Sequence, residues 1–192
     1  MPEAHPGRWS GLAAYAVAAL SVLYAIVYLG FVRPQPDNHA ASALANAFLG
    51  VSGILVSAVA VALGERIGSA GRWIAPVGVA WALLSAVHGA AAAIADLQNT
   101  TLPALGSTDP AGFATFGLAG LWSIVIGRAI REGGTTLPTG LNVLAIVNGV
   151  DLIGLFASNV LGFTTGVLVT GGLASVVLGP AFWIWTGRAL RG

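Results

Sequence analysis

The chain has 192 residues, of which 56% are hydrophobic and 8% charged, with a net charge of +1 and a mean hydropathy of +0.85. Soluble domains carry about 25% charged residues, so eight basic and seven acidic side chains are too few to cover this surface in water. The composition excludes a water-soluble globule and predicts an all-α integral membrane protein whose main partner is the lipid bilayer.

Two residue types are missing, and each absence excludes a class of chemistry. The chain has no cysteine, which excludes disulfides, thiolate metal sites and a cysteine nucleophile. It also has no lysine, which excludes a Schiff base with retinal or pyridoxal phosphate. The net charge is close to zero, so we expect no nucleic-acid partner. No cofactor is expected.

Six apolar runs are each long enough to cross a hydrocarbon core of about 30 Å at about 1.5 Å per residue. They predict a single domain, spanning residues 1–192, with six transmembrane helices at residues 10–31, 42–63, 73–94, 111–130, 138–157 and 166–186. The longest connection ends in Asp109-Pro110, a residue that favours the helix N-cap followed by proline at the first helical position.

Arginine gathers in alternate connections. Seven arginines fall on one side of the predicted membrane and only Arg33 on the other; the seven are Arg8, Arg66, Arg72, Arg128, Arg131, Arg188 and Arg191. Cytoplasmic loops of membrane proteins are enriched in arginine. Six crossings therefore predict that both termini face the cytoplasm, in a multi-pass protein of the inner, or plasma, membrane.

A glycine closely followed by arginine recurs at the cytoplasmic ends of the second, fourth and sixth runs. These glycines are Gly64, Gly127 and Gly187, at intervals of 63 and 60 residues. The spacing indicates three quasi-repeated helical hairpins. An alternative stays open, in which glycine and arginine are simply common at the end of a span in this type of chain.

Three polar side chains fall at equivalent places in the first, third and fifth runs. A shift of 64 residues relates Tyr24 to His88, and a shift of 63 relates His88 to Asp151. A carboxylate at this depth costs about 2.5 to 3.5 kcal/mol, so we expect Asp151 to pair with His88. Tyr24 and Asn148 are expected as further hydrogen-bond partners, because Asn148 shares a helix face with Asp151. These four residues form the candidate ligand or proton site.

Two interpretations of the four residues stay open. In one, they bind a small ligand or handle protons, because ionisable residues inside a membrane are usually functional. In the other, they form an interhelical hydrogen bond that only fixes the packing of the third and fifth helices. An intramembrane enzyme is disfavoured, because no nucleophile motif or HExxH motif accompanies the acid and the histidine.

Several weaker features concern packing and metals. Small residues at four-residue spacing predict close backbone approach at Gly89 and Gly149. In the last run, Gly179-Pro180 predicts a kink, since proline removes a backbone donor. The outer loop offers Asp37, Asn38 and His39 as metal-binding side chains, but one short loop supplies too few ligands, and we expect no metal.

The segments Gly120–Arg128, Leu137–Leu144 and Trp183–Gly187 carry a family resemblance. They resemble a family of bacterial six-span inner-membrane proteins catalogued only as a domain of unknown function. The resemblance is strongest over helices four to six. It implies an inner-membrane location and the same topology, and it transfers no catalytic residue.

Together these features predict a small permease-like or small-ligand-binding membrane protein with an intramembrane polar site. The alternative is a non-catalytic scaffold or accessory subunit, which would bind a protein partner instead of a small molecule. Under the first hypothesis the Asp151→Asn substitution abolishes pH-dependent transport or binding, and under the second it only lowers the melting temperature.

Overall fold

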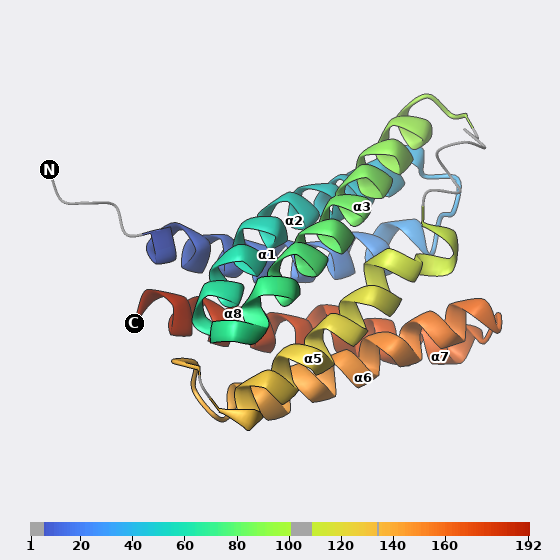
Figure 1. The fold of residues 1–192 in the computed structure, drawn as a ribbon. Coiled ribbons are helices and arrows are strands. Elements are labelled where there is room, and N and C mark those ends of the chain that lie inside the picture. The colour runs from blue at the N-terminus through green and yellow to red at the C-terminus, as the bar shows by residue number, and fades with distance from the viewer. Residues whose placement is uncertain (1–5, 101–108, 134) are drawn as a thin grey trace, which may run out of the picture.

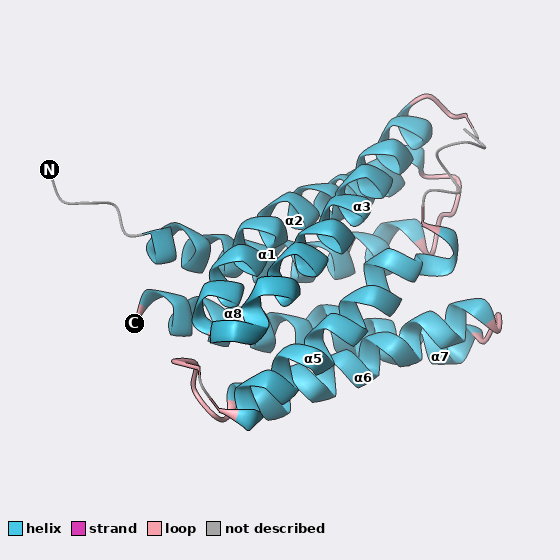
Figure 2. Cartoon of the chain, in the orientation of Figure 1, coloured by secondary structure: helices cyan, strands magenta, loops and turns pink. Residues whose placement is uncertain are grey.

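The computed structural model describes residues 6–100, 109–133 and 135–192, and all regular structure in these ranges is helical (Figure 1, Figure 2). Six continuous helical segments are long and apolar enough to cross a membrane. They are α1 (Pro6–Val27) with η1 (Tyr28–Val32), α2 (His39–Arg66), η2 (Gly68–Ala70) with α3 (Gly71–Leu97), η3 (Pro110–Gly112) and η4 (Phe113–Leu118) with α5 (Ala119–Glu132), α6 (Leu141–Val160), and α7 (Thr164–Gly172) and η5 (Leu173–Leu178) with α8 (Gly179–Arg191). The predicted all-α bundle of six spans is confirmed.

Among the span ends that differ from the predicted ones, two have a clear local reason. The second span starts at His39, three residues early, because the Asn38 side chain accepts a hydrogen bond from Ala41 N at 3.1 Å and caps the helix. The fifth starts at Leu141, three residues late, because Leu141 N donates to Pro138 O in a turn that precedes α6. Asn38 therefore serves as a helix cap in the outer loop.

The outer surface of the bundle is apolar, as a lipid-facing surface must be. On α2, for example, Val51 is 48% exposed and Ile54 62% exposed. Large apolar side chains are exposed in the same way on the other spanning segments. Such a surface is stable in hydrocarbon and would aggregate in water.

Helices pack closely where glycines meet. The most extensively packed pair is α2–α3, followed by α5–α6, α1–α2 and α1–α8. A Cβ added at Gly89 would overlap Gly50 N, and one added at Gly120 would lie 2.7 Å from Gly149 O. The predicted close approach at Gly89 and Gly149 is confirmed, with Gly50 and Gly120 as the partners.

The three glycines of the proposed repeat all lie at helix crossings. A Cβ at Gly64 would lie 3.2 Å from Gly71 O, one at Gly127 would lie 2.7 Å from Asn142 O, and one at Gly187 would lie 2.9 Å from Gly11 O. These contacts join α2 to α3, α5 to α6, and α8 to α1. The glycines therefore allow close helix packing as well as ending a span. The repeat of three hairpins stays a prediction.

The bundle is most densely packed in the half that carries the seven arginines, here called the arginine end. In Figure 1 the start of α1 and the end of α8 both lie at this end. The largest side chains that are less than 2% exposed all belong to this half: Val59, Leu63, Ile74, Ile126, Leu141, Phe182, Thr186 and Leu190. The half toward Arg33 is here called the Arg33 end, and it contains none of these side chains.

Three spans contain a wide π-helical turn in or near the half toward the Arg33 end. These turns are η1, η4 and η5, and each ends in a backbone hydrogen bond over five residues, such as Arg33 N to Tyr28 O at 2.8 Å. In the last span, η5 directly precedes Gly179-Pro180, so the predicted irregularity takes the form of a π turn. Such turns are frequent at functional sites.

Candidate functional site

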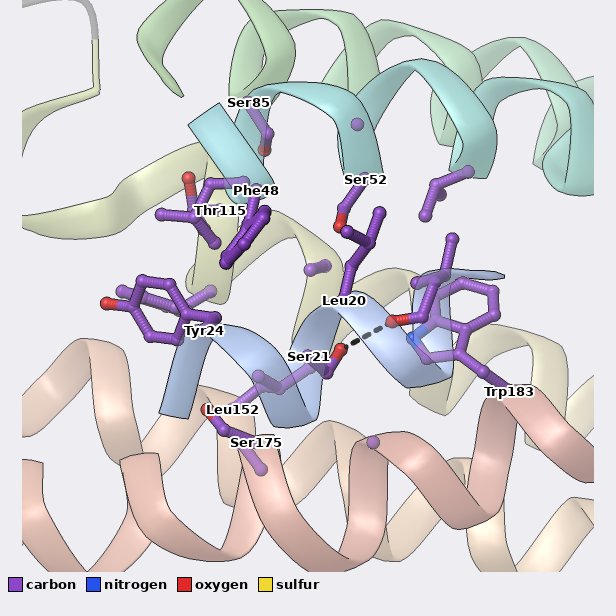
Figure 3. A pocket seen from close by; sticks show the side chains of 18 of the residues that line it. Leu20, Ser21, Tyr24, Phe48, Ser52, Ser85, Thr115, Leu152, Ser175 and Trp183 are labelled. Carbon is purple, nitrogen blue, oxygen red and sulfur yellow. Dashed lines mark hydrogen bonds between the residues drawn. The ribbon is translucent and has the colours of Figure 1, made fainter. Parts of the chain in front are cut away.

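A cavity of about 140 Å³ lies in the middle of the bundle, and we call it the central cavity. Its walls come from α1, α2, α3, η4, α5, α6, η5 and α8. Figure 3 shows Tyr24 at one end of the cavity and Trp183 at the other, with Ser52 and Phe48 of α2 on one side. The cavity therefore lies where many of the helical elements converge.

The polar part of the wall consists of hydroxyl, amide and indole groups. Two of the hydroxyls already donate within their own helices, Ser21 Oγ to Val17 O at 2.9 Å and Ser85 Oγ to Trp81 O at 3.1 Å. Two other groups are buried without a hydrogen-bond partner, namely Trp81 Nε1 and Asn148 Oδ1. Among the buried polar atoms of the described wall, this donor and this acceptor have no partner.

None of the described residues that line the central cavity is charged. Apolar side chains make up the rest of the wall and include Val17, Leu20, Val56 and Leu152. A charged group is costly to bury without a partner. The cavity is therefore suited to an uncharged, mostly apolar molecule.

A second cavity of about 140 Å³ adjoins the first toward the Arg33 end, and we call it the outer cavity. It is bordered by Tyr28 of η1, Asn159 of α6 and Val167 of α7. Tyr24, Phe116 and Ser175 line both cavities. Phe116 belongs to η4 and Ser175 to η5, so two of the π turns form the wall between the cavities.

A buried carboxyl group holds η4 in place. Asp109 is 4% exposed, and its side chain accepts hydrogen bonds from Ala114 N at 2.5 Å and from Thr115 N at 2.9 Å. Thr115 Oγ1 also donates to it at 2.5 Å. The predicted Asp109 cap is present, but it caps the π turn η4 beyond Pro110, because Ala111 and Gly112 turn the chain with positive φ angles.

Two of the four predicted site residues line the central cavity. Tyr24 extends from α1 and stacks on Tyr28, with ring centroids 5.7 Å apart. Asn148 extends from α6 and is 3% exposed. These two residues come from helices on different sides of the cavity.

His88 and Asp151 do not line either cavity, and they lie on helices that are not a closely packed pair. His88 is half-buried and lies three residues beyond Ser85, on the face of α3 that continues from the cavity. Asp151 is half-buried, and its Oδ2 atom has no hydrogen-bond partner. α5 and η4 pack against both α3 and α6. The predicted pairing of His88 with Asp151 stays a prediction.

Sequence reasoning missed Trp81, Trp183 and the serines of the cavity wall. Trp183 has the position of a membrane-interface anchor in the sequence, but it is half-buried and lines the cavity. Trp81 and Ser85 are four residues apart, so they share the face of α3 that meets the cavity. This spacing is the one signal in the sequence that could have identified them.

The fold and the lipid-facing surface define a multi-pass integral membrane protein with a cavity inside its bundle. Comparisons of the chain with protein-family models, with curated proteins and with solved structures find no match. The resemblance of helices four to six to the bacterial six-span family stays an expectation.

Proposed function

We propose that the chain is a permease-like or small-ligand-binding protein of the plasma membrane and that the central cavity is its binding site. The observation that carries this proposal is a cavity within the spanning bundle whose wall holds two buried polar atoms without partners. Buried polar groups in proteins are almost always paired, and an exception calls for an explanation. A bound ligand explains it.

The packing of the two halves supports a route to this site from the Arg33 end. The arginine end is closed by fully buried apolar side chains, such as Leu63, Ile126 and Phe182. The outer cavity extends from the central one toward the Arg33 end. We infer that a ligand enters through the outer cavity, past Tyr24, Phe116 and Ser175.

The orientation in the membrane is tested by labelling single cysteines in two connections. We expect a cysteine at Gln35 to react only with reagent added outside the cell, and one at Ser69 to react only from the cytoplasm, because arginine-rich connections stay inside. Both positions are exposed, and the chain has no other thiol. A membrane-impermeant maleimide on whole and on permeabilised cells gives the measurement. The opposite pattern would contradict the orientation.

Access to the cavities is tested by a cysteine at Ser175, in the wall that the two cavities share. We expect this thiol to react with the small cationic reagent MTSET added from the Arg33 side, because water that enters the outer cavity allows the thiolate to form. The measurement is the fraction of protein labelled in right-side-out and inside-out vesicles.

Two control positions make this result specific. A cysteine at Val51 faces lipid, and one at Thr186 lies in the closed half, where the native side chain is fully buried. Neither is expected to react from either side. An unreactive Ser175→Cys variant would instead favour the alternative function, a scaffold or accessory subunit whose polar residues only fix helix packing.

A further inference from the structure

We propose that the ligand of the central cavity is a small uncharged molecule with an apolar body and a hydroxyl or amide group, which accepts a hydrogen bond from Trp81 and donates one to Asn148. This inference rests on the proposed function, because it assigns a chemical class to the same cavity. It is carried by the chemistry of the wall and by the size of the cavity.

The two unpaired atoms define the polar part of the ligand. Trp81 is 7% exposed and Asn148 3% exposed, so little of either side chain is open to water outside the bundle. The indole N–H can only donate a hydrogen bond, and the amide oxygen can only accept one. An unpaired buried polar group destabilises the protein, because it has lost its hydrogen bonds to water. A ligand that both accepts and donates removes this cost at both atoms.

The apolar part of the ligand follows from the remaining wall and from the volume. Side chains such as Val17, Leu20 and Phe48 offer contacts to hydrocarbon but none to a charged group. A volume of about 140 Å³ is close to that of an engineered apolar cavity of about 150 Å³ that binds benzene. A ring or short chain with one polar group therefore fits, whereas a sugar or an ion does not.

Two hydroxyls of the cavity wall and one indole beside Trp81 already have hydrogen-bond acceptors. The Ser85 hydroxyl donates to Trp81 O, and the Thr115 hydroxyl donates to Asp109. The indole of Trp122, which packs edge-on against Trp81 at 5.7 Å, donates to Ile74 O at 2.8 Å. Trp81 Nε1, by contrast, is a buried donor without a partner.

The test compares two probes that differ by a hydroxyl group, 4-fluorophenol and fluorobenzene, by ¹⁹F NMR. The full chain is placed in lipid nanodiscs at pH 7, where a phenol is uncharged, and empty nanodiscs correct for partition into lipid. We expect 4-fluorophenol to bind about tenfold more tightly than fluorobenzene, because its hydroxyl gains two hydrogen bonds in the cavity in exchange for those it makes with water.

Two variants assign this preference to the two atoms. Trp81→Phe keeps an aromatic ring and removes the donor, and Asn148→Leu keeps the approximate shape and removes the acceptor. Each is expected to reduce the affinity for 4-fluorophenol about fivefold and to leave that for fluorobenzene unchanged. Trp73→Phe is the matched control, because Trp73 is 51% exposed on the outside of α3 and lines neither cavity.

Different results would contradict the proposed ligand class and the proposed function. Equal binding of the two probes overturns the ligand class, since water alone then satisfies the two atoms. A preference for 4-fluorophenol that survives both substitutions overturns it as well. In either case the cavity still stands as a binding site. Failure of both probes to bind also overturns the ligand class. The labelling at Ser175 then decides whether the proposed function fails with it.

Discussion

Replacing Gly89 by alanine is expected to lower the free energy of unfolding by about 2 to 3 kcal/mol. Gly89 lies where α3 crosses α2, the most extensively packed pair of helices. An added Cβ would overlap Gly50 N and lie 2.7 Å from Asn46 O and 2.8 Å from Gly50 Cα. All three are backbone atoms, which cannot rotate away as a side chain can. The two helices must therefore move apart and lose contact along the crossing.

The sign of this effect is informative, because helix propensity alone predicts the opposite. Alanine is favoured over glycine inside a helix by about 1 kcal/mol. The matched control is Gly172→Ala, where the backbone is helical and an added Cβ meets nothing within 4 Å. This variant is expected to be slightly more stable than the native chain.

Reversible unfolding in mixed micelles of dodecyl maltoside and dodecyl sulfate, followed by circular dichroism, measures both variants. The transition of Gly89→Ala should shift to a lower fraction of dodecyl sulfate and that of Gly172→Ala to a slightly higher one. Identical shifts would mean that α2 and α3 do not cross at Gly50 and Gly89.

The largest fully buried side chains and the three π turns lie toward opposite ends of the bundle. Fully buried side chains such as Val59, Ile74 and Leu141 fill the arginine end. The π turns η1, η4 and η5 contribute residues to the cavities. A π turn widens the helix and changes which side chains face inward.

The six spans could be predicted from the sequence because lipid imposes a local requirement, namely about 20 apolar residues in each crossing. Close packing at Gly89 and Gly149 could also be predicted, since small residues four apart share one helix face. These features depend on one helix at a time. The partners Gly50 and Gly120 could not be predicted, because the choice of partner depends on which helices are neighbours.

The candidate site was only partly predictable for a related reason. Equal distance from the helix starts placed Tyr24, His88, and Asp151 at one depth, but it does not determine the direction in which each side chain points around its helix. Tyr24 and Asn148 reach the cavity, whereas His88 and Asp151 are not among the residues that line either cavity. Trp81 was missed because a tryptophan in an apolar run looks like any other core residue. Its unpaired nitrogen is visible only once the surrounding helices are known.

Replacing Asp109 by alanine is expected to destabilise the protein by about 3 kcal/mol or more and to weaken the binding of 4-fluorophenol. The substitution removes the acceptor for Ala114 N, Thr115 N and Thr115 Oγ1 together. Each unpaired buried donor costs about 1 to 3 kcal/mol. Thr115 and Phe116 follow directly in η4 and line the central cavity, so loosening this turn changes the shape of the proposed site.

The matched control is Asp37→Ala, which removes a carboxyl group from an exposed loop at the same end of the bundle. The Asp37 backbone oxygen, not its side chain, accepts the hydrogen bond from His39 N, so little change is expected. Asp109→Asn should fall between the two, because an amide has one oxygen acceptor where the carboxyl group has two. Mixed-micelle unfolding and ¹⁹F titration measure the three variants side by side. If Asp109→Ala proves as stable as Asp37→Ala, the carboxyl group does not hold η4, and the wall between the two cavities must be supported by helix packing alone.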